Sequence, residues 1–518
     1  MTVSGLSPAR KSTAALKSSG ALRHFEFPIV TGALCAWVSL AAIWCFRHGY
    51  ILYYGDAQCH LDISRSVIDS RTPGYDQLGT VWLPLLHVIC LPFVGNDWLW
   101  STGLAGTIPV AICFVIAGTA FYFAAKEAYG SSAAAAVVAA CFALNPNLLY
   151  LATIPMTEVV FLAGLAILVW AALRFRRTQN RALIGLGVVT SWAMSLTRYD
   201  GWFLIPFAAL WFARFSARHR ARVLILFGAM ASVAPLYWMA HNWWETSNAL
   251  DFYNGPYSAA AIQGNRWYAG YHDWILAARY YAAASELCAG WPLVLLAVPG
   301  IVCAFRKNVI TPILFLLLIP LFYIWSIHSS KLPIHVPGLW PHSYYNTRYG
   351  IAVVALAAFA SGAIVCYLPL KKFAFAIPVV ACLPWLIHPS VQNWVCWKES
   401  EVNSVARRAW TAQAAEYLAA HYQMGQGIWI ASGTGDVSGI FCRARIPLAE
   451  TLNMGNGPAW LAAVARPDLA HRQLLAISWD DDAVAAAISR EKQPVYRERV
   501  NIHVKGAPPL RIYRRNDP

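Results

Sequence analysis

The residue best suited to chemistry is an aspartate in a polar segment near the N-terminus. Asp56 follows Gly55 and precedes a stretch of helical character that runs to Ser70. One interpretation is structural, because an Asp at the start of a helix accepts hydrogen bonds from backbone N–H groups that lack a partner. The other is functional, because a fixed carboxylate can take a proton from an acceptor hydroxyl or amine. His60 lies one helical turn after Asp56, so both could face one cavity, and we predict that His60 contacts substrate.

A second acid stands at the start of a long apolar run. Glu158 follows Thr157 and opens the run that ends at Phe175. A Glu in the first turn of a helix interacts favourably with the helix dipole, which is the structural interpretation. An acid at the edge of a hydrocarbon layer is also costly, which favours a functional role, and we predict a catalytic one. In contrast, we expect Asp62 and Arg65 to form a local surface pair.

Three basic residues could bind an anionic group such as a phosphate. They are Arg198, Lys331 and Arg348, and together they could clamp such a group. Snorkelling or local pairing, for example of Arg198 with Asp200, is the alternative. Aromatic and histidine side chains occur in the same segment as the last two: His328, His335, His342, Tyr344 and Tyr345. Of these we predict that His342 and Tyr345 contact substrate; the regular seven-residue spacing of the three histidines is no metal-ligand spacing, so we predict no metal site.

The composition is that of a membrane protein. Of 518 residues, 58% are hydrophobic and 13% are charged, against about 25% charged in soluble proteins. The net charge of +15 could indicate nucleic-acid binding. However, Arg and Lys occur as short clusters between apolar runs, which is the positive-inside pattern. We therefore expect anionic membrane lipids, and no nucleic acid, as partners.

Eleven apolar runs are long enough to span a membrane. The expected spans are Pro28–Phe46, Ser101–Ala125, Ser132–Tyr150, Glu158–Phe175, Ala182–Leu196, Trp202–Phe215, Val223–Trp243, Leu287–Phe305, Ile310–Ile327, Tyr349–Leu368 and Phe373–His388. The apolar segment Trp82–Val94 is short and contains two prolines, so we interpret it as interfacial or re-entrant. With this count every basic loop falls on one side of the membrane.

This topology predicts three parts. Residues 1–27 form a basic cytoplasmic N-terminus before an uncleaved first helix. Residues 28–389 form the membrane domain, and its long loops, above all 47–100, lie outside the cell's inner membrane. Residues 390–518 have no spanning run. Predicted strands there alternate with predicted helices at Asn403–His421 and Asp481–Arg490, and a closing hairpin is predicted at Val495–Arg514, which indicates a small extracytoplasmic α/β domain.

Two further sequence patterns do not indicate a functional site. The segment Gly433–Asp436 follows a predicted strand and could suggest a phosphate loop, but a plain turn is the better interpretation. Eight of the 12 Cys lie in apolar runs. The other four, in or near extramembrane segments, are Cys59, Cys288, Cys396 and Cys442. No CxxC pair occurs, so the sequence signals neither a metal knuckle nor a disulfide framework.

Taken together, these residues resemble the GT-C membrane glycosyltransferases, most closely glycosyltransferase family 39, which includes protein O-mannosyltransferases and lipid A aminoarabinose transferases. Asp56 matches the functional Asp of that family's first outer loop. The segments Ala57–Ser70 and Trp82–Val94 match its two surface helices, and Glu158 matches its second acidic position, which is often Asp. A lysine often found near the second surface helix is missing. The resemblance covers residues 28–215, and beyond them rests on topology.

The resemblance implies an inverting glycosyltransferase. A sugar would pass from a polyprenyl phosphate to a protein, lipid or glycan acceptor, with Asp56 as general base and no cofactor beyond the lipid-linked sugar. Phosphate binding would fall to Arg198, Arg348 or histidines. Two alternatives are a transporter or flippase of lipid-linked sugars, which would carry essential charges deep within its spans, and a non-catalytic scaffold whose outer domain binds a partner.

Overall fold

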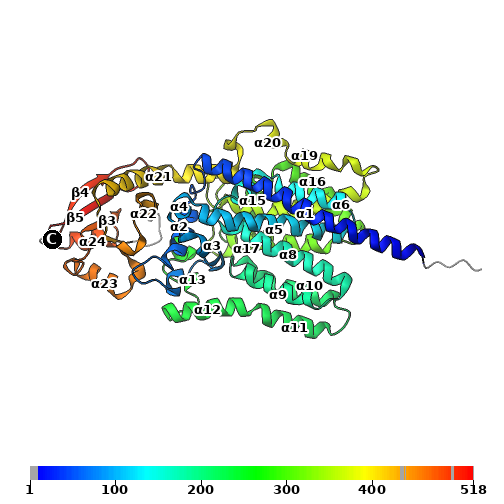
Figure 1. The fold of residues 1–518 in the computed structure, drawn as a ribbon, viewed down its shortest axis with the longest axis horizontal. Coiled ribbons are helices and arrows are strands. Elements are labelled where there is room, and N and C mark those ends of the chain that lie inside the picture. The colour runs from blue at the N-terminus through cyan, green and yellow to red at the C-terminus, as the bar shows by residue number, and fades with distance from the viewer. Residues whose placement is uncertain (1–9, 432–436, 438, 492–494, 517–518) are drawn as a thin grey trace, which may run out of the picture.

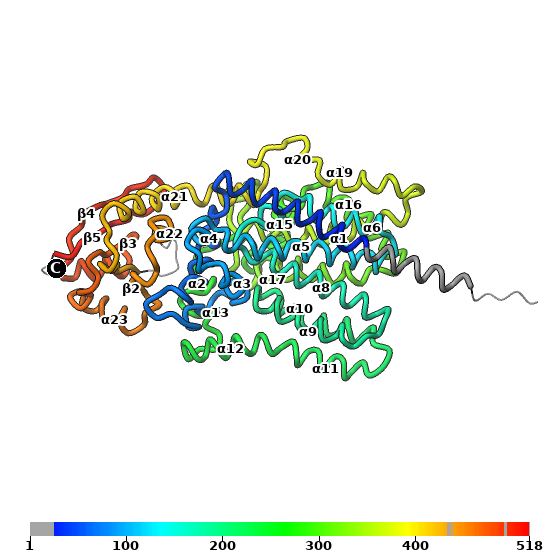
Figure 2. Tube along the Cα trace, in the orientation of Figure 1, coloured from blue at the N-terminus to red at the C-terminus, as the bar shows by residue number. Residues whose placement is uncertain are grey.

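The protein is an elongated helical bundle with a small sheet domain at one end (Figure 1). The computed structural model describes residues 10–431, 437, 439–491 and 495–516, with side chains from residue 25 onward. The chain enters the bundle through α1, and its C-terminal part forms the sheet domain at the opposite end of the long axis (Figure 2). The predicted fold class, a polytopic helical membrane protein with a small C-terminal α/β domain, is confirmed.

The first part of the bundle follows the apolar runs of the sequence. Its helices are α1 (Arg10–Arg47), α5 (Leu104–Tyr129), α6 (Ser132–Ala143), α7 (Pro146–Leu151), α8 (Thr157–Thr178), α9 (Ala182–Ser195) and α10 (Asp200–Phe215). Local signals set several ends. Asn145 accepts a hydrogen bond from the Leu148 N–H and Pro146 takes the first helical position, which starts α7. Gly130, with φ +64°, ends α5 in the left-handed conformation that glycine adopts without strain.

The second part contains more interrupted helices. They are α11 (Arg220–Ala231), α12 (Val233–Thr246), α13 (Asp251–Asn254), α14 (Ala259–Gln263), α15 (Trp274–Ala289), α16 (Trp291–Arg306), α17 (Thr311–Ser329), η2 (Thr347–Ile351), α18 (Ala352–Gly362), η3 (Ala363–Tyr367), η4 (Lys371–Phe375), α19 (Ala376–Ala381) and α20 (Leu383–Ile387). The pair α15 and α16 is bent by 105° at Gly290, whose φ is +80°. Residues 274–286, which lie between two predicted spans, belong to the helix α15.

Every predicted span contains helix, but the number of spans is not fixed by the fold. Among the described residues, six helices are long and apolar enough to cross a membrane, or seven if the bent pair is one span. The remaining predicted spans correspond to shorter or broken helices, such as α6 with α7 and α19 with α20. The count of eleven and the side on which each loop lies stay predictions.

The segment between α1 and α5 folds over the end of the bundle nearest the sheet domain. It contains α2 (Gly55–Ser66), η1 (Tyr75–Leu78), α3 (Leu85–Val94) and α4 (Asp97–Thr102), so both predicted surface helices are present in shortened form. The expected pair of Asp62 with Arg65 is wrong. Asp62 is buried and accepts hydrogen bonds from Gln58 and Trp100, whereas Arg65 pairs with Asp69 and Asp97.

The C-terminal domain is a five-stranded mixed sheet with helices packed around it. After η5 (Val391–Asn393), the long helix α21 (Val395–His421) leads from the bundle into the sheet. The strands are β1 (Ile428–Ile430), β2 (Thr451–Leu452), β3 (Leu475–Trp479), β4 (Tyr496–Ile502) and β5 (Leu510–Arg515), in the order β2-β1-β3-β5-β4. β1 pairs in parallel with β2 and β3, and β5 is antiparallel to β3 and β4.

Shorter helices connect these strands. They are α22 (Gly439–Ala444), η6 (Leu448–Glu450), η7 (Met454–Asn456), α23 (Pro458–Ala465), η8 (Pro467–Leu469) and α24 (Ala483–Ser489). The predicted helices and the closing hairpin are present, with α21 starting eight residues earlier than the predicted Asn403–His421. The turn considered at Gly433–Asp436 lies outside the described residues.

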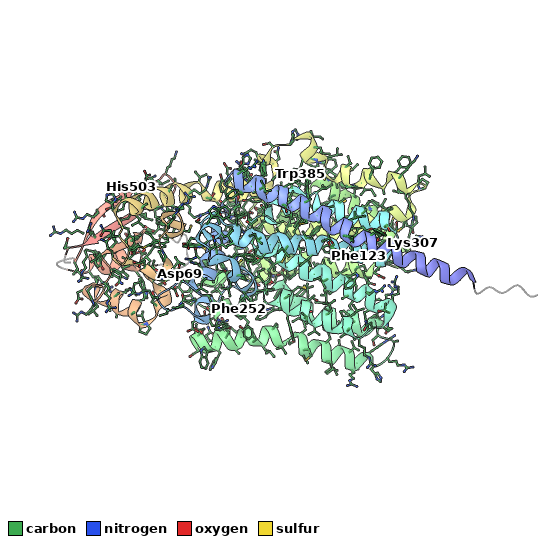
Figure 3. All side chains as sticks on the ribbon, in the orientation of Figure 1. Asp69, Phe123, Phe252, Lys307, Trp385 and His503 are labelled. Carbon is green, nitrogen blue, oxygen red and sulfur yellow. The ribbon has the colours of Figure 1, made fainter. Side chains whose placement is uncertain are left out.

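The sheet domain rests directly on the segment after α1. The Asp69 carboxylate, labelled in Figure 3 at the junction of bundle and domain, accepts hydrogen bonds from the backbone N–H groups of Leu448 and Ala449. Asn456 donates a hydrogen bond to the Thr72 hydroxyl. Lys307, in one of the basic loops, lies toward the other end of the bundle (Figure 3). The residues expected to do chemistry therefore lie near the end that the sheet domain covers.

Reporter fusions test the predicted sidedness. Alkaline phosphatase, which is active only outside the cytoplasm, is fused after Asn180, between α8 and α9, and in a second chain after Ser390. We expect activity from the Ser390 fusion alone, because only the first site lies in a basic loop. Equal activity of the two fusions, or the reverse pattern, contradicts the eleven-span topology.

Candidate active site

A single arginine lies at the centre of the candidate site. The Arg348 guanidinium, in η2, donates from Nη2 to Asp56 Oδ2 at 2.5 Å and from Nε to Glu158 Oε1 at 3.2 Å. Its Nη1 reaches Glu399 Oε1 at 3.5 Å, and its backbone N–H donates to Glu399 Oε2 at 3.0 Å. These carboxylates come from α2, α8 and α21, so Arg348 joins three separate regions of the chain.

A second arginine extends the cluster into the bundle. Arg198 Nη1 donates to the same Glu158 Oε1, at 3.2 Å, and to the Thr157 hydroxyl. Its Nη2 donates to the Tyr323 hydroxyl at 2.7 Å, and its Nε lies 3.4 Å from Asp200 Oδ1. The sequence alternative, local pairing of Arg198 with Asp200, is therefore present, but it coexists with the bond to Glu158. We call these six charged residues, Asp56, Glu158, Arg198, Asp200, Arg348 and Glu399, the ionic cluster.

Aromatic rings hold both guanidiniums in place. The Tyr349 ring lies 4.9 Å from the Arg198 guanidinium carbon and 5.2 Å from that of Arg348. The Tyr54 ring lies 4.9 Å from the Arg348 carbon, and its hydroxyl donates to Glu399 Oε2 at 3.2 Å. Stacked guanidiniums gain cation–π attraction and lose rotamer freedom. Each arginine is thus fixed by contacts on its faces and on its edge.

Close backbone packing brings η2 to this position. Gly350, two residues after Arg348, lies against the backbone carbonyl of Ala284 in α15, and there is no room for a Cβ there. A larger residue would push η2 away from α15 and with it the Arg348 side chain. The glycine therefore allows the approach on which the cluster depends.

The four carboxylates of the cluster differ sharply in exposure. The Asp56 side chain is 41% exposed, against 3% for Glu158 and 1% for Glu399. Burial raises the pKa of Glu399, although Arg348 and the Tyr54 hydroxyl oppose that rise. A buried acid held between fixed partners suits a structural task, whereas an exposed one can meet a substrate. Asp56 is therefore the carboxylate of the cluster that can exchange protons with a bound molecule.

The structural interpretation of Asp56 as a helix cap is wrong. Helix α2 begins at Gly55 after Tyr54, and no side chain caps it. Asp56 lies in the first turn, and the ion pair with Arg348 accounts for its carboxylate position. The helix N-terminus still favours a negative charge there.

His60 does not share the immediate surroundings of Asp56. It is buried, with its Nδ1 2.9 Å from His87 Nε2 and its ring 4.4 Å from the Trp82 ring. Burial, aided by the charge of Arg348, lowers its pKa to about 3. A neutral, fully packed histidine holds α2 against α3, and its predicted contact with substrate stays a prediction.

The remaining predicted contact residues lie on the loop after α17. Lys331 Nζ donates to the Gly264 carbonyl at 3.0 Å and lines a separate cavity of about 420 Å³. The exposed His342 is hydrogen-bonded through Nδ1 to the Pro337 carbonyl. Tyr345 lies nearer the cluster: burial raises its pKa, and the negative charge of Asp56 adds to the rise. Of the three, the structure brings Tyr345 toward Asp56 and gives Lys331 and His342 other partners.

Two residues of the site escaped the sequence analysis. Glu399 lies in the first turns of α21, ahead of the predicted start of that helix, and nothing in its neighbourhood signals burial. Arg266, on the loop between α14 and α15, is close enough for its charge to lower the pKa of Tyr345. No local pattern could have found either residue, because their partners are distant in the chain. Among the described residues, no group of three or more His, Cys, Asp or Glu is placed to hold a metal ion.

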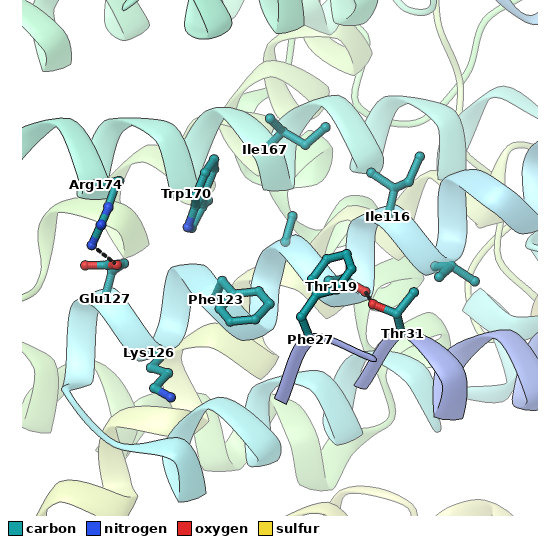
Figure 4. Close-up of a pocket in the computed structure, with 12 residues that line it drawn as sticks. Phe27, Thr31, Ile116, Thr119, Phe123, Lys126, Glu127, Ile167, Trp170 and Arg174 are labelled. Atoms are coloured by element: carbon teal, nitrogen blue, oxygen red, sulfur yellow. Dashed lines mark hydrogen bonds and ion pairs between the residues drawn. The ribbon is translucent and has the colours of Figure 1, made fainter. Parts of the chain in front are cut away.

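An apolar cavity lies apart from the ionic cluster. It measures about 470 Å³ and lies among α1, α5 and α8, with Thr31 and Thr119 hydrogen-bonded to each other and the Glu127–Arg174 pair at one end (Figure 4). Of the α8 residues that line this cavity, Ile167 is the one nearest to Glu158 along the helix. It comes nine residues after Glu158, which is about 14 Å along a helix. The cavity shares no residue with the ionic cluster.

The helical membrane bundle and the ionic cluster at one end of it define a polytopic membrane protein with a candidate enzyme site. Residues 99–243 match the sequence family described as dolichyl-phosphate-mannose-protein mannosyltransferase. The matched segment contains Glu158 and Arg198 but not Asp56, Arg348 or Glu399. The match confirms the resemblance of this chain to the GT-C glycosyltransferases.

One solved structure aligns with most of this chain. The apo crystal structure of the Archaeoglobus fulgidus oligosaccharyltransferase aligns over 86% of this chain and 70% of its own, at 12% identity and a TM-score of 0.43. No curated protein matches the sequence.

Removing the central arginine tests whether the cluster depends on it. Arg348→Met keeps the length of the side chain but removes its charge. Glu399 then stays buried without Arg348, and Glu158 keeps its bond to Arg198. Breaking a buried pair in this way costs about 3–5 kcal/mol. We expect a clear drop of the unfolding temperature of the purified protein in detergent.

The matched control is Arg466→Met, which removes the exposed pair of Arg466 with Asp468. Such surface pairs contribute little, so its unfolding temperature should equal that of the wild type. If both variants unfold at the wild-type temperature, Arg348 does not hold the cluster together.

Proposed function

We propose that this protein is a glycosyltransferase that moves a sugar from a polyprenyl-phosphate donor to an acceptor on the extracytoplasmic side of the cell's inner membrane. The observation that carries the proposal is the contrast within the ionic cluster: one half-exposed carboxylate, Asp56, is fixed by a buried arginine that other carboxylates hold. The likeness of residues 99–243 to a mannosyltransferase family supports the reaction class.

The chemistry follows from the inventory of groups. An acceptor O–H or N–H attacks the anomeric carbon of the donor sugar, and Asp56 takes its proton. The bond between the anomeric carbon and the phosphate oxygen breaks, and polyprenyl phosphate leaves with the electron pair. Attack opposite the leaving group inverts the anomeric configuration. A phosphate is a good leaving group, so no general acid is needed.

Arg348 orients the base in this mechanism. Its Nη2 bond to Asp56 Oδ2 occupies one carboxylate oxygen and leaves the other for the acceptor proton. Glu158 and Glu399 bind the guanidinium at Nε and Nη1, so these contacts fix the position of Arg348. Glu158 therefore acts in catalysis through the position of Arg348. Preorganised groups of this kind need no rearrangement at the moment of reaction.

The leaving phosphate requires positive charge. A guanidinium has five N–H donors, and three of those of Arg348 are spent on carboxylates. We assign the phosphate to the donors of Arg348 and Arg198 that remain, with Tyr345 at the exposed side. Lys331, bound to Gly264, and His342, bound to Pro337, would have to leave those partners to reach it. The mechanism uses no cofactor besides the lipid-linked sugar.

The two alternatives make different demands on the structure. A transporter or flippase of lipid-linked sugars needs charges along its path through the bilayer. The ionic cluster instead gathers at helix ends, where α2, α8, α10 and η2 begin. A scaffold that acts only through its sheet domain gives Asp56 no task, so Asp56 should tolerate substitution.

Replacing the proposed base separates these functions. Asp56→Asn keeps the size of the side chain and its bond to Arg348 but cannot accept a proton. A positioned base contributes about 10²–10⁴-fold, so we expect transfer to fall by that factor. The assay measures transfer of a labelled hexose from synthetic polyprenyl phosphate to endogenous acceptors in isolated membranes.

The control is Asp97→Asn, in the same segment, whose 76% exposed side chain pairs with Arg65. It should transfer at the wild-type rate. Wild-type transfer by Asp56→Asn, at an equal amount of folded protein, would falsify the assignment of the base.

A further inference from the structure

Two cysteines from distant parts of the chain meet beside the ionic cluster. Cys288 lies in the last turn of α15, and Cys396 lies in the first turn of α21, 108 residues later. Their sulfur atoms are 3.9 Å apart, and both residues are completely buried. Both belong to segments that the predicted topology places at or beyond the outer surface of the membrane.

One buried amide fixes the two backbones relative to each other. Asn147, at the start of α7, donates from Nδ2 to the Cys288 carbonyl and accepts at Oδ1 from the Cys396 N–H, both at 3.0 Å. Asn145 donates to the same Cys288 carbonyl at 3.0 Å. These hydrogen bonds fix the positions of the two backbones. The short distance between the sulfurs is therefore set by the fold and not by mobile side chains.

We propose that Cys288 and Cys396 form a disulfide bond in the mature protein, an inference that rests on the outward orientation assumed in the proposed function. A sulfur–sulfur bond is about 2.0 Å long, so rotation of the two side chains has to close about 2 Å. Disulfides persist in the oxidising compartments outside the cytoplasm. The short distance between the sulfurs and the predicted compartment both favour the bond.

The oxidation balances as a thiol–disulfide exchange. A protein thiol oxidase supplies a disulfide, one cysteine thiolate attacks it, and a mixed disulfide forms. The second cysteine thiolate then attacks the mixed disulfide and releases the oxidase as its dithiol. Two protons and two electrons leave the cysteine pair, and the oxidase takes up all of them on becoming its dithiol.

The timing of this exchange follows from burial. The thiolate is the reactive form, and burial raises the pKa of the Cys396 thiol well above its usual value. An oxidase also cannot reach two fully buried sulfurs. The bond therefore forms before α21 docks against α15, and afterwards it resists reductants until the protein unfolds.

The disulfide would fix a residue of the site. Cys396 is one helical turn before Glu399, and its carbonyl accepts a hydrogen bond from the Tyr54 hydroxyl, which also donates to Glu399. A covalent link from Cys396 to α15 holds the beginning of α21, and so the Glu399 carboxylate, against Arg348. The bond connects the sheet domain's leading helix to the bundle at the point where the site needs it.

Mass spectrometry tests the bond on the full-length protein. Membranes are acidified to stop exchange, the protein is unfolded, and free thiols are alkylated with and without prior reduction. The chain has 12 Cys, so we expect ten alkylated thiols without reductant and 12 with it. A peptide cross-linked through Cys288 and Cys396 should appear in the unreduced digest. Alkylation of both residues without reductant overturns the proposal.

Serine variants identify the pair and separate it from the proposed function. In the wild type, we expect reductant to lower the unfolding temperature. In Cys288→Ser, reductant should leave the unfolding temperature unchanged, and Cys396 should be alkylated without reductant. Cys442→Ser, a buried cysteine whose sulfur contacts Gln58, should keep both wild-type behaviours. These readouts do not depend on transfer. A cross-linked but inactive protein would overturn only the proposed reaction, and an active one with both thiols free would overturn only the disulfide.

Discussion

The cost of burying carboxylates in an apolar bundle governs the candidate site. Glu158 and Glu399 are almost completely buried, and a buried charge is stable only when it is paired and hydrogen-bonded. Arg348 supplies that pairing and reaches partners that are 292, 190 and 51 residues away in the chain. The cluster therefore exists only in the complete fold. The same guanidinium that neutralises the buried acids holds the exposed one, so stability and the proposed catalysis depend on one side chain.

The C-terminal part of the chain contributes to the site through α21. Glu399 belongs to that helix, and its carboxylate contacts both the side chain and the backbone of Arg348. Farther along the domain, the backbone N–H groups of Leu448 and Ala449 in η6 donate to Asp69, in the segment that carries Asp56. The sheet domain is therefore joined to the site from two sides. Deleting it from Ser390 would remove a residue of the ionic cluster, so loss of activity in such a truncation would not assign a separate role to the sheet.

The sequence predicted those features of the fold and the site that depend on one strong local signal. Each apolar run predicted a segment that contains helix, because a membrane span needs a long apolar stretch. The helices α13, α14 and most of α15 lie between two predicted spans and were not predicted. Glu158, Arg198 and Arg348 were identifiable as unusual charges at the ends of such runs. Glu399 was not, because an acid at the start of a polar helix is ordinary until the fold buries it. The cap interpretation of Asp56 failed for the same reason: a cation 292 residues away is invisible to local pattern analysis.

The sharing of Glu158 between two arginines has a consequence for biosynthesis. Arg198 is 40 residues after Glu158, whereas Arg348 is 190 residues after it. During translation, the next helical hairpin therefore makes a counter-ion available to the acid that opens α8 about 150 residues before Arg348 is made. A buried charge is less costly when it is paired than when it is alone. The order of translation is thus also the order in which the two arginines become available to neutralise Glu158.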